Sequence, residues 1–306
     1  MRPIPALAAM AWLTLAGPAL AAGTLLESRE SLYNNIFVFE QGDLVIMQFG
    51  KNEQFWTESV YDRSDDRALP VTYTRYLTAA LAYPPEVGSI LEIGLGGGRT
   101  AAYLNLHMPE VAIHSVELDP EVIELAERHF DVEPNGTFTI EAVDGRIHLM
   151  RSDATHDIIM VDAYRGPFVP FHMLTREFYL TAKRRLAQGG VLAQNIEPTT
   201  MLFDSAVATL ASVFDNVDLY PSGGNVVAIA YDGPRREQAA LVARAQALQD
   251  MHGFTYPLPE LLAERRVMSR APDAEPLVDD FAPVEMLKSI ARHNQGIDEI
   301  AAPAGQ

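Results

Sequence analysis

The residues with the clearest chemical potential form a glycine-rich loop, LEIGLGGGRT, at positions 91–100. A loop of this kind, between an apolar strand and a helix, leaves backbone N–H groups free and lets a ligand approach closely. A dinucleotide-binding loop, G-x-G-x-x-G, would need a glycine at position 99, where the chain has Arg99. Instead, one acid precedes glycines spaced two residues apart: Glu92, Gly94, Gly96 and Gly98. The loop therefore predicts a ligand site that is not made for a dinucleotide.

The acid and the spaced glycines resemble motif I of the class I S-adenosylmethionine-dependent transferases, and further acids lie where such a nucleoside needs them. Glu117 ends the second predicted strand and can accept hydrogen bonds from both ribose hydroxyls. Asp144, followed by Gly145, ends the third and can accept from the adenine amino group. Asp162 ends the fourth behind four apolar residues, so it is a candidate general base or cation binder with a raised pKa. Asp119 is expected to cap a helix instead.

The elements that must position these residues alternate between strands and helices, which predicts a mainly parallel sheet covered on both faces. Strands are predicted at 89–95, 111–118, 137–143, 156–164 and 191–196. Helices are predicted at 71–83, 100–106, 120–130, 174–186 and 201–214, the fourth closed by Gly189-Gly190. The segments 216–221 and 225–231 are expected to form an antiparallel pair.

Four regions are predicted along the 306-residue chain. Residues 1–21 resemble a signal peptide, with a basic start, an apolar run and the cleavage pattern Ala19-Leu20-Ala21. Residues 22–70 form a β-hairpin module that turns at Gln41-Gly42, with 55–70 as loop or short strands. Residues 71–233 form the Rossmann-like nucleoside-binding domain, and 234–306 a helical C-terminal extension. A periplasmic or secreted protein without stable membrane insertion is expected, or a cytoplasmic one if the leader is a start-site artefact.

Composition limits the classes of function. The formal charge of −18, from 41 acids and 23 bases, opposes nucleic-acid binding and is compatible with a cationic substrate such as a polyamine. The chain has no cysteine, which excludes disulfides and thiol chemistry. Its eight histidines show no H-x-x-x-H or H-E-x-x-H spacing, so no metal site is predicted.

From about residue 27 to 232 the chain resembles the spermidine synthase family, the polyamine aminopropyltransferases. The resemblance rests on the hairpin module and on LEIGLGGGRT, VELDPEVIELAERHF, VDGR, DIIMVDAY and LTREFY. It extends to a bacterial subgroup of spermidine synthase-like proteins that carry I-G-L-G-G-G in the loop and D-D-F-A-P-V-E near the end, here residues 279–285. That last segment would be a structural clamp on the sheet edge, or its acids would reach the acceptor pocket.

The resemblance implies a class I S-adenosylmethionine-dependent transferase fold and transfer of an aminopropyl group from decarboxylated S-adenosylmethionine to a polyamine, with release of methylthioadenosine. By position, it implies that Glu117 binds ribose, Asp144 binds adenine and Asp162 is the catalytic base. It aligns Gln54 with a glutamine beside the nucleoside and Tyr61 with a tyrosine that lines the polyamine site. It also implies a homodimer formed through the hairpin module.

Two departures from the family pattern concern cation binding. The family loop usually reads G-G-G-D-G-G, and its aspartate, which holds the donor's amino group, is replaced here by Gly97. A second family aspartate, for the acceptor amine, is replaced by Arg165. An arginine there would repel a polyamine by roughly a kcal/mol or more. It would suit a carboxylate, as in intact S-adenosylmethionine or an anionic acceptor, or it would point to solvent.

Three functions are therefore compared. The first is aminopropyl transfer to a cationic amine. The second is a methyltransferase that uses intact S-adenosylmethionine, favoured by Gly97 but disfavoured because residues 162–164 lack an N/D-P-P-Y-type segment. The third is an exported, non-catalytic binding protein for polyamines or nucleosides, favoured by the leader and the replaced carboxylates.

Overall fold

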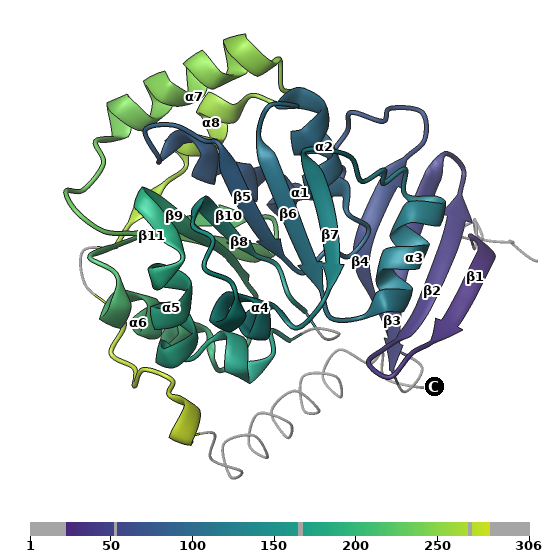
Figure 1. Ribbon diagram of the computed structural model, residues 1–306, viewed down its shortest axis with the longest axis horizontal. Helices are drawn as coiled ribbons and strands as arrows, with labels where there is room; N and C mark the ends of the chain where they lie inside the picture. Colours follow the sequence, from purple (N-terminus) through teal and green to yellow (C-terminus); the bar gives the residue numbers. More distant parts are fainter. Residues whose placement is uncertain (1–22, 52–53, 165–167, 269–270, 282–306) are drawn as a thin grey trace, which may run out of the picture.

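The computed structural model describes residues 23–51, 54–164, 168–268 and 271–281. These form two sheets, a small antiparallel one at one end and a large mixed one with helices on both faces (Figure 1). The predicted signal peptide, Arg165 and residues 282–306 lie outside the described residues. In the part of the chain that is described, no helix is long and apolar enough to span a bilayer.

The large sheet has the strand order β12-β10-β11-β9-β8-β5-β6-β7. Its parallel strands are β5 (Ser89–Ile93), β6 (Ala112–Glu117), β7 (Phe138–Ala142), β8 (His156–Val161) and β9 (Leu186–Ile196). Its antiparallel edge consists of β10 (Asn216–Ser222), β11 (Asn225–Tyr231) and the short β12 (Arg266–Val267). The sheet confirms the predicted parallel arrangement and the antiparallel pair that closes it.

Helices cover both faces of this sheet (Figure 1). One layer contains α1 (Thr72–Leu77), the 3₁₀ helix η1 (Thr78–Ala82), α2 (Arg99–His107), α7 (Gln238–His252) and α8 (Leu258–Ala263). The other contains α4 (Gly145–Arg151), η2 (Phe171–Met173), α5 (Arg176–Arg184) and α6 (Phe203–Val213). The short η3 (Asp279–Phe281) follows β12 along the chain.

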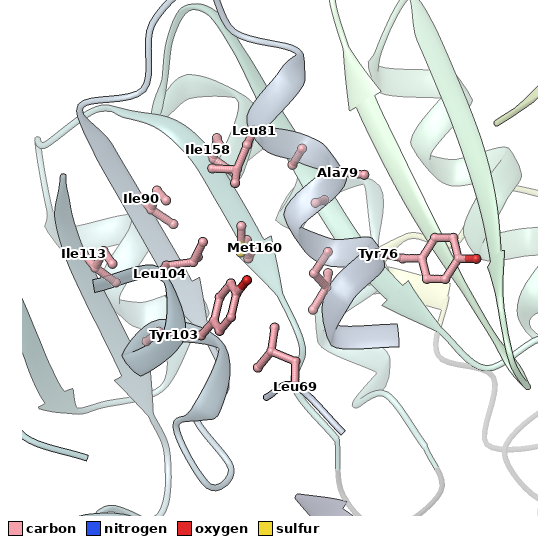
Figure 2. Packing of buried hydrophobic residues seen from close by; sticks show 14 of the residues in the cluster. Leu69, Tyr76, Ala79, Leu81, Ile90, Tyr103, Leu104, Ile113, Ile158 and Met160 are labelled. Atoms are coloured by element: carbon pink, nitrogen blue, oxygen red, sulfur yellow. The ribbon is translucent and has the colours of Figure 1, made fainter. Parts of the chain in front are cut away.

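Apolar side chains alternate along the strands and so divide the core into two layers. On β5, Ile90 packs in the cluster under α1 and α2, whereas Leu91 and Ile93 pack in the cluster under α5 and α6. Figure 2 shows the first cluster, where Tyr103 and Leu104 of α2 meet Ile90 and the neighbouring strands. Both faces of the parallel strands are thus buried, which fixes the strand ends that carry the predicted site.

The small sheet has the order β1-β2-β3-β4, and two of its strands differ from the prediction. The expected hairpin is present as β2 (Asn35–Gln41) and β3 (Leu44–Lys51). Before it, β1 (Thr24–Glu30) pairs with β2, and the segment expected to be loop or short strands contains the nine-residue β4 (Gln54–Asp62). Of the acidic residues that suggested a loop, Glu58 lies on β4 and lines the cavity described below, Asp62 ends the strand, and Asp65 and Asp66 follow it.

A second difference concerns Gly189-Gly190, expected to end a helix. Helix α5 ends at Arg184, and the two glycines lie inside β9, where the register with β8 shifts between His156 and Ile158. A side chain at Gly190 would approach three backbone oxygens at 2.9–3.0 Å, so glycine is needed there for strand contact and not for a helix cap.

The small sheet lies beside α3 (Pro120–His129) (Figure 1). Charged side chains join the two. Arg29 donates to Glu121 at 2.7 Å, and Glu27 accepts from Arg128 and from His129 at 2.8 Å. These bonds, led by that from His129, lower the pKa of Glu27 to about 2. The contact brings the turn between β1 and β2 against the large sheet next to the end of β6.

The first part of the predicted C-terminal extension is helical, but the chain then returns to the sheet as β12. Beyond it, Asp279 of the DDFAPVE segment holds α4 and α5 together. Its carboxylate pairs with Arg146 and accepts from Thr175 Oγ1 at 2.8 Å, while its N–H donates to Glu177 at 2.9 Å. Asp279 thus connects two helices and not the sheet edge at which a clamp was expected, and residues 282–285 of the segment lie outside the described residues.

Candidate functional site

A cavity lies at the carboxyl ends of the parallel strands, with the small sheet as its second wall. The cavity is open to solvent at its mouth. Most of the predicted site residues line it: Glu92, Gly94, Gly96, Glu117, Asp144, Gly145 and Asp162. Gly98 instead precedes α2 as its N-cap, with a left-handed φ of 65°.

The glycine loop packs too closely for side chains. At Gly94, φ is +93° and a Cβ would lie 2.2 Å from the carbonyl oxygen of Asp162. Any other residue would push the ends of β5 and β8 apart. The start of the glycine loop therefore lies close against the end of β8, and backbone atoms form this part of the cavity wall.

Gly97 has a different reason to be glycine. A Cβ there would lie 2.7 Å from the ring of Phe130 and 2.7 Å from Ser59 Cβ. The Gly97 N–H donates to Ser59 Oγ at 2.7 Å, so the loop is tied to β4 at this point. The structure has no room for the aspartate that the family pattern places here, which explains the departure.

Glu117 is held at the end of β6 by two backbone donors. Its carboxylate accepts from Leu95 N at 2.9 Å and from Asp119 N at 3.0 Å. Burial raises its pKa, against the lowering effect of these N–H groups. Asp119 is the N-cap of α3, as predicted, and its other oxygen accepts from Ser31 and Asn34 of the β1–β2 turn. This turn closes the cavity over Glu117.

Asp144 has two structural partners. It is the N-cap of α4, where Oδ1 accepts from Ile147 N at 2.9 Å, and Oδ2 lies 3.3 Å from His172 Nε2. The bond from His172 is the main cause of a lowered Asp144 pKa. The residue after Asp144 is a glycine because a Cβ at position 145 would lie 2.2 Å from Ile93 Cγ2. His172 lies in a loop-rich segment and the sequence analysis missed it.

Asp162 lies at the end of β8 with its carboxylate in the cavity. Oδ1 accepts from Asn195 Nδ2 at 2.9 Å, and Tyr73 provides a further hydrogen bond. Burial nevertheless raises the pKa of Asp162 to about 6. Tyr73 lines the cavity, whereas Tyr61 does not, because the Tyr61 ring packs under the Arg99 guanidinium at 4.3 Å. Of the three tyrosines that line the cavity, Tyr33, Tyr73 and Tyr164, Tyr73 is the one that bonds to Asp162. The Gln54 side chain lies outside what the structure describes.

Glu58 is the main site residue that the sequence analysis missed. It projects from β4 into the cavity, and its Oε1 is buried without a hydrogen-bond partner among the described residues. Burial, together with the nearby charges of Asp162 and Glu117, raises its pKa well above the usual value. A buried carboxylate oxygen without a partner is costly, so this atom is available for a ligand's donor.

Acidic side chains outnumber basic ones in the described lining of the cavity. Five carboxyl groups line it: Glu58, Glu92, Glu117, Asp144 and Asp162. Of the described lining residues, only Arg99 and His172 are basic. Arg99 donates to the backbone carbonyls of Asp66, Phe130 and Asp131, and His172 faces Asp144. Among the described lining residues, the cavity therefore has acceptors for a cationic ligand and no arginine that is free to bind an anionic one.

Glu92 is the most deeply buried of these acids and has a structural partner. Ser115 Oγ donates to its Oε2 at 2.6 Å, and burial raises the Glu92 pKa to about 8. Glu92 is therefore mostly protonated at neutral pH and holds a hydrogen-bonded position behind the glycine loop.

The Glu92→Gln variant is expected to lose a pH dependence of stability. The folded state holds this proton up to a pKa of about 8, and the unfolded state releases it near 4.5. The stabilisation from the protonated group is thus complete below pH 4.5 and is lost as the pH rises through 8, by at most about 1.4 kcal/mol per pH unit. Urea unfolding measures this as a difference in the free energy of unfolding between the variant and the wild type. That difference should shift in favour of the variant by about 1–3 kcal/mol between pH 6 and pH 8.5. An unchanged difference would contradict a buried neutral Glu92.

Comparison with known proteins gives consistent matches. The family model for the spermine/spermidine synthase domain matches residues 72–222. A curated polyamine aminopropyltransferase of Vibrio vulnificus is 32% identical over 300 residues, which cover 94% of this chain and 99% of that protein. The crystal structure of a probable spermidine synthase from Corynebacterium glutamicum, 20% identical, has a TM-score of 0.67 and covers 84% of this chain and 98% of that chain. The crystal structure of human methyltransferase-like protein 13 in complex with SAH is 21% identical and has a TM-score of 0.54. The match covers 70% of this chain and 99% of that chain.

Proposed function

Because this chain belongs to the polyamine aminopropyltransferase family, we propose that it transfers an aminopropyl group from decarboxylated S-adenosylmethionine to a polyamine amine. The observation that carries this proposal is the cavity with five carboxyl groups and no free arginine among its described residues. Both proposed substrates are cations, one a sulfonium with an ammonium group and the other a polyamine. Buried carboxylates favour such ligands over anionic ones.

The nucleoside half of the donor has its partners at the ends of β5, β6 and β7. Glu117 has lone pairs left for the ribose hydroxyls after it accepts from the two N–H groups that orient it. Asp144 offers Oδ2 to the adenine amino group, shared with His172. The side-chain-free surface at Gly94 and Gly96 allows the nucleoside to lie against the backbone.

The chemical step is a displacement at carbon. The acceptor nitrogen attacks the aminopropyl carbon bonded to sulfur, so a C–N bond forms, the C–S bond breaks and methylthioadenosine leaves with the electron pair. The proton lost by the amine passes to the carboxylate of Asp162. With a pKa of about 6, Asp162 is ionised at neutral pH and remains basic enough to accept a proton. Tyr73 and Asn195 hold its orientation.

Glu58 supplies the carboxylate that the glycine loop lacks. The family aspartate cannot be present at Gly97, because Phe130 and Ser59 occupy the space. Glu58 precedes Ser59 on the same strand and places an unpartnered oxygen in the cavity. In this proposal it binds the ammonium group of the donor chain, so the loss at position 97 does not remove donor binding.

The direct test is isothermal titration of the purified protein with decarboxylated S-adenosylmethionine, intact S-adenosylmethionine and methylthioadenosine, for the wild type and for Glu117→Ala. The wild type should prefer the decarboxylated donor to the intact one by at least tenfold, because the extra carboxylate would enter an acidic cavity. The variant should lose tenfold or more in affinity for all three, because it loses the ribose acceptor.

The other two functions are outcomes of the same titration. Preference for the intact donor would support a methyltransferase, the function that the SAH-bound human structure represents in this fold. Binding of methylthioadenosine and polyamines without product formation would support a non-catalytic binding protein. No binding of any nucleoside would overturn both enzyme proposals.

The place of action and the assembly are separate proposals. Export to the periplasm or the medium is supported by the signal-peptide pattern of residues 1–21, and N-terminal sequencing of the secreted protein would test it. Homodimer formation through the small sheet is supported by the family resemblance and by β1, which forms an edge of that sheet. Light scattering of the wild type and of a β1 variant with added charges would test it.

A further inference from the structure

Three potential metal ligands meet on the large sheet outside the catalytic cavity. His114 of β6, Glu141 of β7 and His148 of α4 form a group whose ligand atoms all lie within 4.8 Å of one another. None of the three lines the cavity. His114 lies three residues before Glu117 on its strand, about 10 Å along the chain direction. The group is therefore separate from the site described above.

The distances suit a small divalent ion. His114 Nε2 lies 3.4 Å and His148 Nδ1 lies 3.0 Å from Oε2 of Glu141. Tetrahedral zinc with bonds of about 2.0–2.2 Å separates its ligand atoms by about 3.3–3.5 Å. Both distances to Glu141 thus lie within a few tenths of an ångström of this separation, whereas the ligand atoms of His114 and His148 lie within 4.8 Å of each other, so the two rings would move closer around one ion.

The surroundings fix one ligand and leave room for water. Thr139 Oγ1 lies 2.8 Å from His114 Nδ1, which orients the ring so that Nε2 points to Glu141. Such an outer partner is typical of metal-binding histidines. The side chains of His114 and His148 are 28% and 12% exposed, and that of Glu141 is 51% exposed. The group is partly buried but open on one side, so a fourth ligand can come from solvent.

We propose that His114, Glu141 and His148 bind one zinc-like transition-metal ion, completed by water. Two imidazoles and one carboxylate select zinc, copper, nickel or cobalt over calcium or magnesium, which prefer oxygen ligands. The pattern is absent from the sequence because the three ligands come from three elements, with spacings that match no linear motif.

The ion would have a structural effect near the catalytic cavity. It would join the edge strand β7 to α4, and His148 lies one helical turn after Asp144, to whose carbonyl its N–H donates at 2.9 Å. Binding would therefore stabilise the start of α4, where Asp144 and Gly145 line the cavity. This inference does not depend on the proposed reaction.

The test is isothermal titration of zinc chloride into chelator-treated, untagged protein. The wild type should bind one ion per chain with micromolar or tighter affinity, and magnesium should not compete. His114→Ala, His148→Ala and Glu141→Gln should each weaken binding at least tenfold, whereas His252→Ala, a histidine on α7, should leave it unchanged. No binding, or binding that the three variants do not weaken, would overturn the proposal.

X-ray absorption on the zinc-loaded wild type provides a readout that does not depend on the folding of any variant. Scattering from two imidazole rings and two oxygen ligands is expected. A signal from one imidazole only, or from oxygen ligands only, would show that zinc binds elsewhere and would equally overturn the proposal.

Discussion

Asp162→Asn is expected to lower kcat/KM for aminopropyl transfer by about 10²–10⁴-fold, with donor affinity unchanged within a few fold. The amide keeps the size of the side chain and can still accept from Asn195, but it cannot take the proton of the attacking amine. Rates of product formation, with affinities measured by titration, separate the two effects. A comparable loss of donor affinity would indicate a binding role for Asp162 in place of a chemical one.

Protonation of Asp162 is also expected to set the acidic limb of the pH profile of kcat/KM. Because burial raises the Asp162 pKa to about 6, protonation of this carboxylate should lower kcat/KM about tenfold per pH unit below 6. Asn195→Ala removes a donor that lowers this pKa, so it should move the limb to higher pH. A limb that remains at the same pH in Asp162→Asn would assign it to another group.

Glu117, Asp144 and Asp162 could be placed from the sequence because the fold relates them simply. Each follows a predicted strand, and the carboxyl ends of parallel strands meet at one edge of a sheet. Strand length and apolar pattern are therefore enough to bring three distant acids together. The glycine loop could be placed for the same reason, since it follows the central strand β5.

Glu58 and His172 could not be placed this way. Glu58 belongs to a second sheet, and its direction depends on how β4 packs against the glycine loop through Ser59 and Gly97. The same dependence explains the misplaced tyrosine, because the Tyr61 ring packs against Arg99 of α2 while Tyr73 of α1 lines the cavity. Contacts between modules follow no periodicity that a sequence displays.

The departures at Gly97 and Gly190 show a related limit. A glycine in a sequence predicts freedom of the backbone, but here the reason is the space taken by a distant partner. For Gly97 the partners are Phe130 and Ser59, and for Gly190 they are backbone oxygens of β8 and of its own strand. Which residue lies against the glycine determines why a side chain is excluded there, and that residue can be identified only from the packed structure.

Glu58→Gln is expected to lower kcat/KM by about 10–100-fold, mainly through a higher KM for the decarboxylated donor. A hydrogen bond to a charged group contributes about 1.5–3 kcal/mol, which corresponds to this range. The amide preserves size and polarity, so stability should change little. Glu40→Gln is the matched control, because Glu40 belongs to the same sheet but pairs with Arg63 away from the cavity. A variant with wild-type KM for both substrates would contradict the assigned role.

Proton release gives an independent reading of the same interaction. Burial raises the Glu58 pKa, and an ammonium ion beside the carboxylate would lower it. Donor binding near neutral pH should then release a proton, measured as a dependence of the titration enthalpy on the ionisation enthalpy of the buffer. That dependence should disappear in Glu58→Gln but remain in Glu40→Gln. If both variants retain it, the proton comes from Asp162 or another cavity acid, and the ammonium group of the donor is held away from β4.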